Sequence, residues 1–238
     1  MPLSRLIKYL VFTAFLTAYF CFNAEAKSEV GKIIQVIGDV DLTDINSGIR
    51  IVPGVGSQIK EYHKIRTGAK AYIEILLNDN SKIFMRELSI IQIGSLRMKA
   101  QESPTSISLS TGKIRIKIDK SFSNWNLIIK TNVAIIGVKD IETDLGIITT
   151  DIETKAVVFE GEASAANSNR VIIKSFIVKK KEEISIKQNR SPSEPVVLPQ
   201  EILDSWLDYY EVVDKNKIEI KGKQDTGIFD YILRKRKF

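Results

Sequence analysis

The segment Lys113-Ile114-Arg115-Ile116-Lys117-Ile118 decides the fold class of this chain. Isoleucines alternate with cations along it, and a β-strand places successive side chains on opposite faces of its sheet. The segment is therefore predicted to be a half-buried strand. Its isoleucines should lie in a core, and Lys113, Arg115 and Lys117 should face solvent.

The same period of two continues on both sides of this segment. Ser106–Leu109 alternates in the same way, and Thr111-Gly112 between the two alternating segments predicts a hairpin turn. A single longer strand is expected over Ile59–Thr67. Ile, Val and Thr are frequent throughout, and their branched side chains suit a pleated surface. We therefore predict an all-β domain over residues 29–187, either a multi-stranded sandwich or a β-solenoid-like stack.

Another hairpin is predicted from Ala71–Leu77 and Lys82–Arg86, with the turn Asn78-Asp79-Asn80-Ser81 between them. Asn and Asp tolerate the left-handed backbone that so tight a turn needs. The sequence therefore predicts that the chain reverses between these two strands.

The first residues have the pattern of a secretory signal peptide. Arg5 and Lys8 precede an apolar run from Tyr9 to Phe22, and Ala24-Glu25-Ala26 supplies small residues at a cleavage site. A membrane-spanning helix needs roughly 20 apolar residues, more than this run contains. We expect residues 1–26 to be removed on export, the alternative being an uncleaved anchor. Cys21, the single cysteine, would leave with them.

Export changes what the basic charge of the chain implies. The formal net charge is +6, which in a cytosolic protein would suggest nucleic acid as a partner. Outside the cytosol the available polyanions are glycans and lipid headgroups. No nucleic acid is therefore expected, and the protein should lie in the periplasm or elsewhere in the cell envelope.

The composition changes after residue 187. Residues 188–198 are polar and contain Pro192 and Pro195, as in a linker. A short amphipathic helix is predicted to begin at Pro199. Its apolar face, formed by Ile202, Leu203, Trp206, Leu207 and Tyr210, must be buried on its own sheet or on a partner. The segment 199–238 ends in a basic tail, Arg234, Lys235, Arg236 and Lys237, which suggests peripheral contact with a membrane.

Residues with catalytic or metal-binding chemistry are few. His63 lies beside cations and lacks a triad partner in the sequence around it. Asp140, Glu142 and Asp144 would share one face of a strand, where they are either a solvated outer face or oxygen ligands for Ca²⁺. The solvated face is the favoured interpretation. We expect no enzyme activity, no cofactor and no metal.

With its strands and turns placed, the chain resembles the FecR family, a bacterial periplasmic β-rich domain known from regulators of iron-uptake signalling. The resemblance runs from about Gly31 to Lys187, and its first motif is Gly38-Asp39-Val40. In the stretch 131–141, Lys139, Asp140 and Ile141 stand where the family usually has Arg, Gly and Thr. The positions that carry the motifs, and to which the resemblance gives a structural role, are Thr67, Gly68, Asp79, Ser81, Gly112, Thr131, Ala134, Gly137, Val138 and Gly161.

The resemblance implies the fold and the compartment but does not carry over the signalling role, because residues 1–26 are expected to be a signal peptide where the signalling members have a cytoplasmic segment. Two functions follow as expectations. The first is a non-catalytic exported module that binds another envelope protein, for example by strand addition. The second is an electrostatic binder of envelope polyanions, through Lys113, Arg115, Lys117 and residues 234–237.

Overall fold

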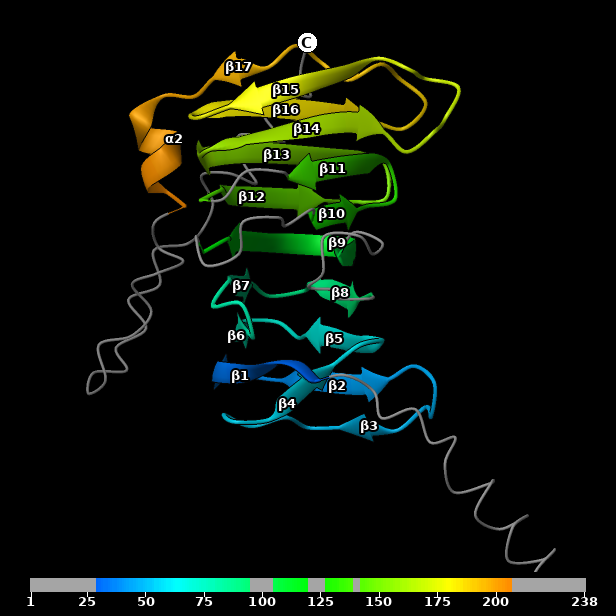
Figure 1. Ribbon diagram of the computed structural model, residues 1–238, viewed down its shortest axis with the longest axis vertical. Helices are drawn as coiled ribbons and strands as arrows, with labels where there is room; N and C mark the ends of the chain where they lie inside the picture. Colours follow the sequence, from blue (N-terminus) through cyan, green and yellow to red (C-terminus); the bar gives the residue numbers. More distant parts are fainter. Residues whose placement is uncertain (1–28, 95–104, 120–126, 139–141, 207–238) are drawn as a thin grey trace, which may run out of the picture.

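The computed structural model describes residues 29–94, 105–119, 127–138 and 142–206. The described residues form seventeen strands and one short helix, so the predicted all-β fold is confirmed. Figure 1 shows the strands stacked one above another, from the N-terminal strands in blue at the bottom to the last strands in yellow at the top.

The pairing of the strands divides the stack into two faces, here called sheet A and sheet B. Sheet A has the order β4 (Gln58–Lys60), β1 (Glu29–Ile37), β6 (Tyr72–Leu77), β7 (Lys82–Met85), β9 (Thr105–Lys117), β12 (Asp144–Thr149), β13 (Glu153–Glu160), β16 (Glu182–Lys187) and β17 (Val196–Val197). All of these pairs are antiparallel.

Sheet B is built in the same manner. Its order is β3 (Arg50–Ile51), β2 (Val40–Asp44), β5 (His63–Thr67), β8 (Ile90–Ile93), β9, β10 (Leu127–Lys130), β11 (Ala134–Val138), β14 (Glu162–Asn167) and β15 (Ser175–Lys179). The pair β9–β10 is parallel, and the other pairs of sheet B are antiparallel. Because β9 belongs to both sheets, hydrogen bonds connect all the strands into one mixed sheet.

The chain passes between the two sheets at residues with left-handed backbone. One example is Tyr62, with φ 64°, which separates β4 in sheet A from β5 in sheet B. The predicted single strand over Ile59–Thr67 is therefore wrong, because this corner divides it. Residues with positive φ at such crossings are Gly38, Gly56, Tyr62, Lys70, Leu88, Gly112, Glu142, Gly161 and Lys181.

The predicted hairpin at Thr111-Gly112 is also wrong, because β9 runs without reversal through both residues. Gly112 has φ +100° and turns the strand from sheet B into sheet A. A β-carbon at this position would lie 2.4 Å from the backbone of Ser89, so the close approach also requires glycine. The hairpin of β6 and β7 is confirmed, and Asn80 in its turn has φ 65°.

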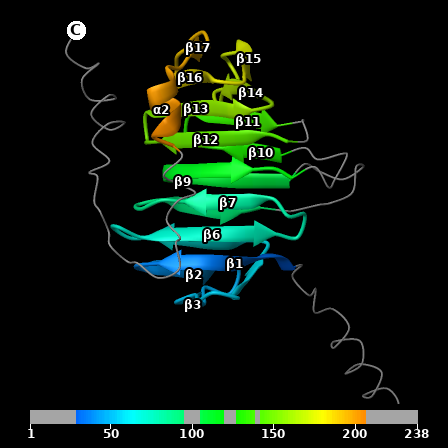
Figure 2. The same cartoon turned by 90° about the vertical axis from the view of Figure 1, so that its left-hand side faces the viewer.

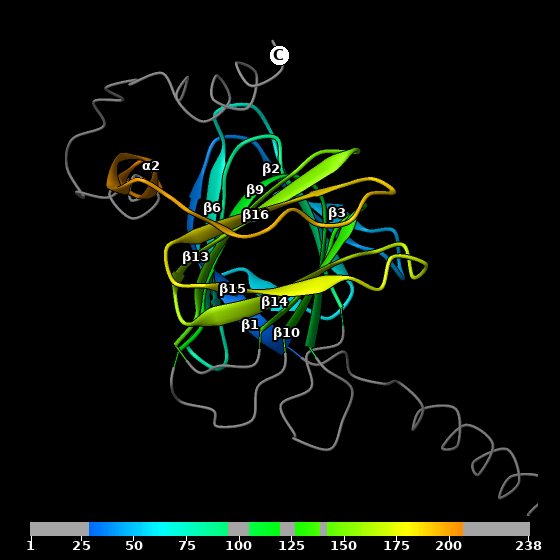
Figure 3. The same ribbon diagram turned by 90° about the horizontal axis from the view of Figure 1, so that it is seen from above.

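The main core lies between the two sheets and consists of aliphatic side chains from both. Ile114 and Ile116 of β9 belong to it, with 0% and 1% of their surface exposed. A second, smaller cluster lies on the outer surface of sheet A beneath the helix α2 (Gln200–Asp204). Figures 2 and 3 both place α2 outside the stack and against sheet A.

Candidate functional site

Charged and aromatic side chains lie on the outer surface of sheet A, where a row of paired residues crosses β7, β9, β12 and β13. Phe84 lies opposite Arg115, Arg115 opposite Gly146, and Gly146 opposite Val157. The side chains of this row point away from the core, because successive residues of a strand face opposite sides and Ile114 and Ile116, next to Arg115, point into the core. In this row Arg115 therefore lies beside Gly146, which has no side chain.

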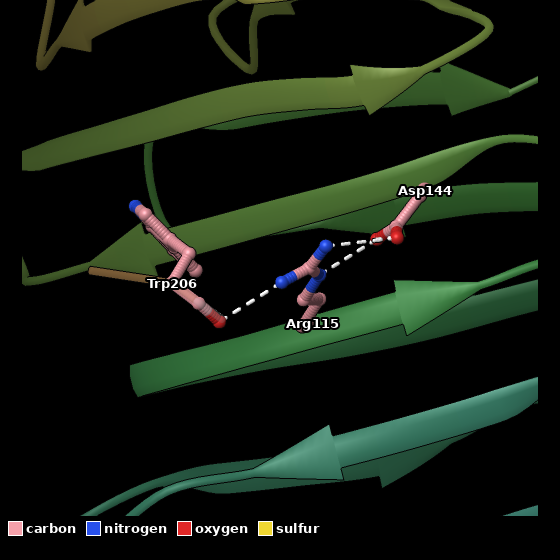
Figure 4. A network of polar contacts seen from close by, with 3 residues as sticks. All are labelled: Arg115, Asp144 and Trp206. Atoms are coloured by element: carbon pink, nitrogen blue, oxygen red, sulfur yellow. Dashed lines mark hydrogen bonds and ion pairs between the residues drawn. The ribbon is translucent and has the colours of Figure 1, made fainter. Parts of the chain in front are cut away.

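Arg115 forms a two-pronged ion pair with Asp144 of the neighbouring strand. Its Nε donates to Oδ1 at 2.8 Å and its Nη2 donates to Oδ2 at 2.9 Å. A third bond, from Nη1 to the main-chain oxygen of Trp206, measures 2.9 Å (Figure 4). The Arg115 side chain is only 3% exposed, so its charge is held by oxygen atoms of the protein.

The indole ring of Trp206 fills the space above Gly146. A β-carbon on Gly146 would lie 2.5 Å from the ring, so glycine at this position makes room for it. The ring meets Phe159 edge to face, with 5.5 Å between centroids, and Lys113 Nζ lies 4.3 Å from its centre. The guanidinium of Arg115 lies 3.9 Å from the centre of the Phe159 ring. Cations and aromatic rings therefore alternate around the tryptophan.

The residues that cover this surface are 198–206, here called the strap. Leu198, Leu203 and Trp206 of the strap are buried against Tyr72, Phe84, Ile148 and Val157 of sheet A. Burial raises the pKa of the Tyr72 phenol far above its ordinary value, so this side chain stays neutral. Helix α2 itself is a single turn, and no side chain caps its N-terminus.

The expected environment of two predicted contact residues is corrected by this arrangement. Lys113 and Arg115 were expected to face solvent, but they are 8% and 3% exposed because the strap lies over them. Lys117, the third cation of the segment, is exposed. The alternation of β9 correctly indicates which side chains leave the core. The signal for the cover was Gly146 on an outward position, together with a tryptophan in the predicted helix.

The expected packing of that helix is partly visible. Leu203 and Trp206 lie on the sheet of their own chain, while Leu207 and Tyr210 are outside the described residues. The expected linker, 188–198, contains β17, which pairs with β16, and Ser193 donates its N–H to Ser185 O at 2.9 Å. The tail residues 234–237 and the segment 1–26 also lie outside the described part of the chain.

One group of the family-motif residues lies in turns and corners rather than around the strap. Thr67 accepts a hydrogen bond from the N–H of Ser89, and Gly68 donates to Asp39 O. Asp79 accepts two bonds from Ser81 within the β6–β7 turn. Gly112 and Gly161 have positive φ at crossings between the sheets.

A second group of these motif residues lies in β11 and in the turn that precedes it. Thr131 Oγ1 accepts the N–H of Ala134 at 2.9 Å and lies 2.7 Å from Thr154 Oγ1. Gly137 accepts a bond from Ser164 Oγ at 3.1 Å, and Val138 is buried. These contacts tie β11 to its neighbours, and they give the positions a role in the shape of the stack.

Among the described residues, those considered for metal or acid–base chemistry do not form a cluster. The carboxylate of Asp144 is bound to Arg115, and Asp140 lies outside the described residues. His63 is buried, and its Nδ1 accepts the N–H of Lys60 at 3.2 Å. Within the described ranges no group of three His, Cys, Asp or Glu residues is placed to hold a metal ion. Nor does this part of the chain contain a helix long and apolar enough to cross a membrane.

The ends of the stack expose apolar side chains beside strand edges. At the C-terminal end, β15 pairs with β14 along one side, and Ile177 of β15 is 51% exposed. Val171 and Ile173, just before this strand, are 85% and 92% exposed. At the opposite end, Val52 is 82% exposed beside β3.

Comparison with known proteins identifies one family. Residues 63–164 match the family model described as FecR protein. None of the curated proteins compared with the chain matches it.

Solved structures give weaker likenesses. Two crystal structures of a protein from Parabacteroides distasonis ATCC 8503, proposed to be an anti-sigma factor, each match 60% of this chain with 10% identity and a TM-score of 0.49. The match covers 63% of the first of these chains and 64% of the second. A structure described as a cell surface anchoring domain matches 27% of this chain and 84% of its own, with 25% identity and a TM-score of 0.26.

Proposed function

Residues 63–164 are a FecR domain, and on that premise we propose that the chain is a non-catalytic, exported module of the cell envelope that binds another envelope protein. The family supports a regulatory or envelope role rather than catalysis. Export is supported by the signal-peptide pattern of residues 1–26.

The observation that carries the proposal of protein binding is the outer edge of β15. In the described part of the chain, β15 forms strand pairs with β14 alone, which leaves its other side available for hydrogen bonds. An extended segment of a partner would add there as a further strand of sheet B. Ile177, Val171 and Ile173 supply exposed apolar side chains beside that edge.

Strand length favours β15 over the other edges of the stack. β3 and β17 contain two residues each and β4 contains three, whereas β15 contains five. Native edges are commonly protected by being short or by carrying charges. Lys179 stands at one end of β15, but its interior, Phe176, Ile177 and Val178, is apolar.

The test replaces Ile177 with Lys in the full chain and compares it with Val52→Lys at the opposite end of the stack. Both side chains are exposed, so both variants should keep the melting temperature of the wild type. The three proteins are used as bait for cross-linking in native envelopes. The proposal requires a partner that wild type and Val52→Lys capture and Ile177→Lys loses. Equal capture by all three would refute it.

Binding of envelope polyanions is the less supported function. The strap covers Lys113 and Arg115, so of the cations in β9 only Lys117 remains exposed for such a ligand. The expectation then rests on Lys117 and the tail, Arg234, Lys235, Arg236 and Lys237. No observation on the described residues favours it over protein binding.

A further inference from the structure

The surface beneath the strap combines apolar side chains with two cations, and cations are side chains that commonly face water. On β9 the residues that face the permanent core are isoleucines, whereas those that face the strap are Lys113 and Arg115. Permanently buried charges are costly, and apolar residues of similar size often serve as well in such places. The two cations Lys113 and Arg115 therefore suit a surface that is covered in one state of the protein and open to water in another.

The strap is held by few contacts. Its helix has one turn and no side-chain cap, and its largest buried side chain is that of Trp206. Leu198 donates its N–H to Lys181 O at 2.9 Å, which fixes the strap at its beginning. Beyond that bond, the position of the strap is defined by the burial of Leu198 and Leu203, by the indole ring over Gly146 and by the main-chain oxygen that Arg115 binds.

We propose that the strap is the resident occupant of a second protein-binding site, and that a segment of a partner replaces it there. The contacts of Trp206 define the chemistry of that segment. It needs an electron-rich aromatic ring, which fits over Gly146 between Lys113 and Phe159. It also needs an oxygen acceptor next to that ring, a carbonyl or a carboxylate, for the Nη1 of Arg115.

This site is distinct from the strand edge proposed above. It lies on the outer surface of sheet A, over β9, β12 and β13, whereas β15 belongs to sheet B. Its recognition uses a ring and one oxygen instead of a row of main-chain hydrogen bonds. A variant of Ile177 that loses strand addition should therefore keep this site intact, so the two proposals fail separately.

The experiment uses a fluorescein-labelled peptide with the sequence of residues 196–206, VVLPQEILDSW, as the probe. It is titrated into the full chain as wild type, Trp206→Ala and Gly146→Ala. In the wild type the tethered strap competes at an effective concentration in the millimolar range. We therefore expect Trp206→Ala to bind the peptide at least tenfold more tightly than the wild type.

The variant Gly146→Ala tests whether the peptide binds at the place that the ring of Trp206 occupies. Its added methyl group occupies the seat of the ring, so this variant should lose the strap contact and still fail to bind the peptide. Val52→Ala, at an 82% exposed position far from the strap at the opposite end of the stack, is the control and should behave as the wild type. A peptide that ends in Ala in place of Trp should not bind any of them.

Two results would overturn the proposal. One is a folded Trp206→Ala variant that binds the peptide no better than the wild type. The other is a wild-type dimer in sedimentation that Trp206→Ala dissolves, because the occupant would then be the strap of a second copy.

Hydrogen exchange of the wild type gives an answer that does not depend on the folding of any variant. The amides of Leu198, Leu203 and Trp206 should exchange by local opening, at least tenfold faster than those of Ile114 and Ile116 in β9. Exchange of both groups only through global unfolding would also contradict a replaceable strap.

Discussion

The two faces of β9 are both buried, but they are buried in different ways. Ile114 and Ile116 point into an aliphatic core that closes between two sheets, whereas Lys113 and Arg115 point outward and are covered by a nine-residue strap, 198–206. The inner face gains from removing apolar area from water. The outer face depends on pairing each charge with an oxygen or an aromatic ring. Burial alone therefore does not show how much a face contributes to folding.

The largest effect is expected from the inner face. Ile116→Ala removes a side chain that is 1% exposed and leaves a cavity between the sheets. We expect the free energy of unfolding to fall by about 4 kcal/mol, as for other buried large-to-small changes. Urea unfolding followed by circular dichroism measures it. Ile177→Ala, at a 51% exposed position, is the control and should change the value by less than about 0.5 kcal/mol.

On the outer face, the free energy of unfolding should fall more when one member of the ion pair Arg115–Asp144 is removed than when both are removed. Arg115→Met leaves Asp144 covered and without its guanidinium, so we expect a loss of about 2–3 kcal/mol in the free energy of unfolding. Arg115→Met with Asp144→Leu should recover most of that loss. The same urea unfolding curves measure both. A double variant that is as unstable as Arg115→Met alone would show that the ion pair itself is stabilising, and the two faces of β9 would then differ less.

Glycine substitutions at the corners that join the two sheets should raise the free energy of unfolding instead of lowering it. Leu88 has φ 54° and is 62% exposed, so its side chain contributes little packing while its backbone is strained. Leu88→Gly should raise the free energy of unfolding by about 0.5–1 kcal/mol. Lys181→Gly, at φ 67°, is an independent repeat of the same change. A loss of stability in both would show that these corners are held by contacts and not strained.

The smallest expected effect is the pH dependence of stability that comes from Asp79, a buried carboxyl group in the β6–β7 turn. Unlike Asp144, it is not paired with an arginine in the contacts described above. Burial raises the pKa of Asp79 above its ordinary value of 3.8, against the opposing hydrogen bonds from Ser81. The folded state therefore keeps this proton longer than the unfolded state does. The contribution of Asp79 to stability is present below pH 3.8 and is lost as the pH rises toward the folded-state pKa.

Asp79→Asn cannot ionise and should not show this loss. We expect the urea midpoint of the variant to rise relative to the wild type between pH 3.5 and pH 7. The measurement is a pair of unfolding curves at each pH for both proteins. A wild type that instead gains on the variant over this range would mean that ionised Asp79 is favoured by the fold.

The sequence predicted the local pattern well and the long-range contacts less well. The alternation in Lys113–Ile118 correctly separates core-facing from outward side chains, because the period of a strand depends only on neighbouring residues. The turn at Asn78–Ser81 was found for the same reason. One error lies at Tyr62, where a corner between the sheets divides a strand that was predicted to be continuous. Another lies at Gly112, where a turn signal marks such a corner instead of a reversal of the chain.

The candidate site needed information that no local pattern contains. Arg115 and Trp206 are separated by 91 positions in the chain, and a cation that points out of a strand has the same sequence pattern whether water or a helix covers it. Gly146 carried the one usable clue, because a glycine on the outward face of a strand commonly marks the close approach of another group.

The position of β9 in the chain has a consequence for how the protein folds. Strands β1 to β8 precede it and pair among themselves, strands β10 to β17 follow it and do the same, and β9 takes a neighbour from each set in each sheet. Each half can therefore form its hairpins independently, and strand pairing joins the two halves only when β9 has paired on both sides. Folding should proceed outward from short-range pairs, as in repeat proteins, with the completion of β9 as the step that makes the whole stack cooperative.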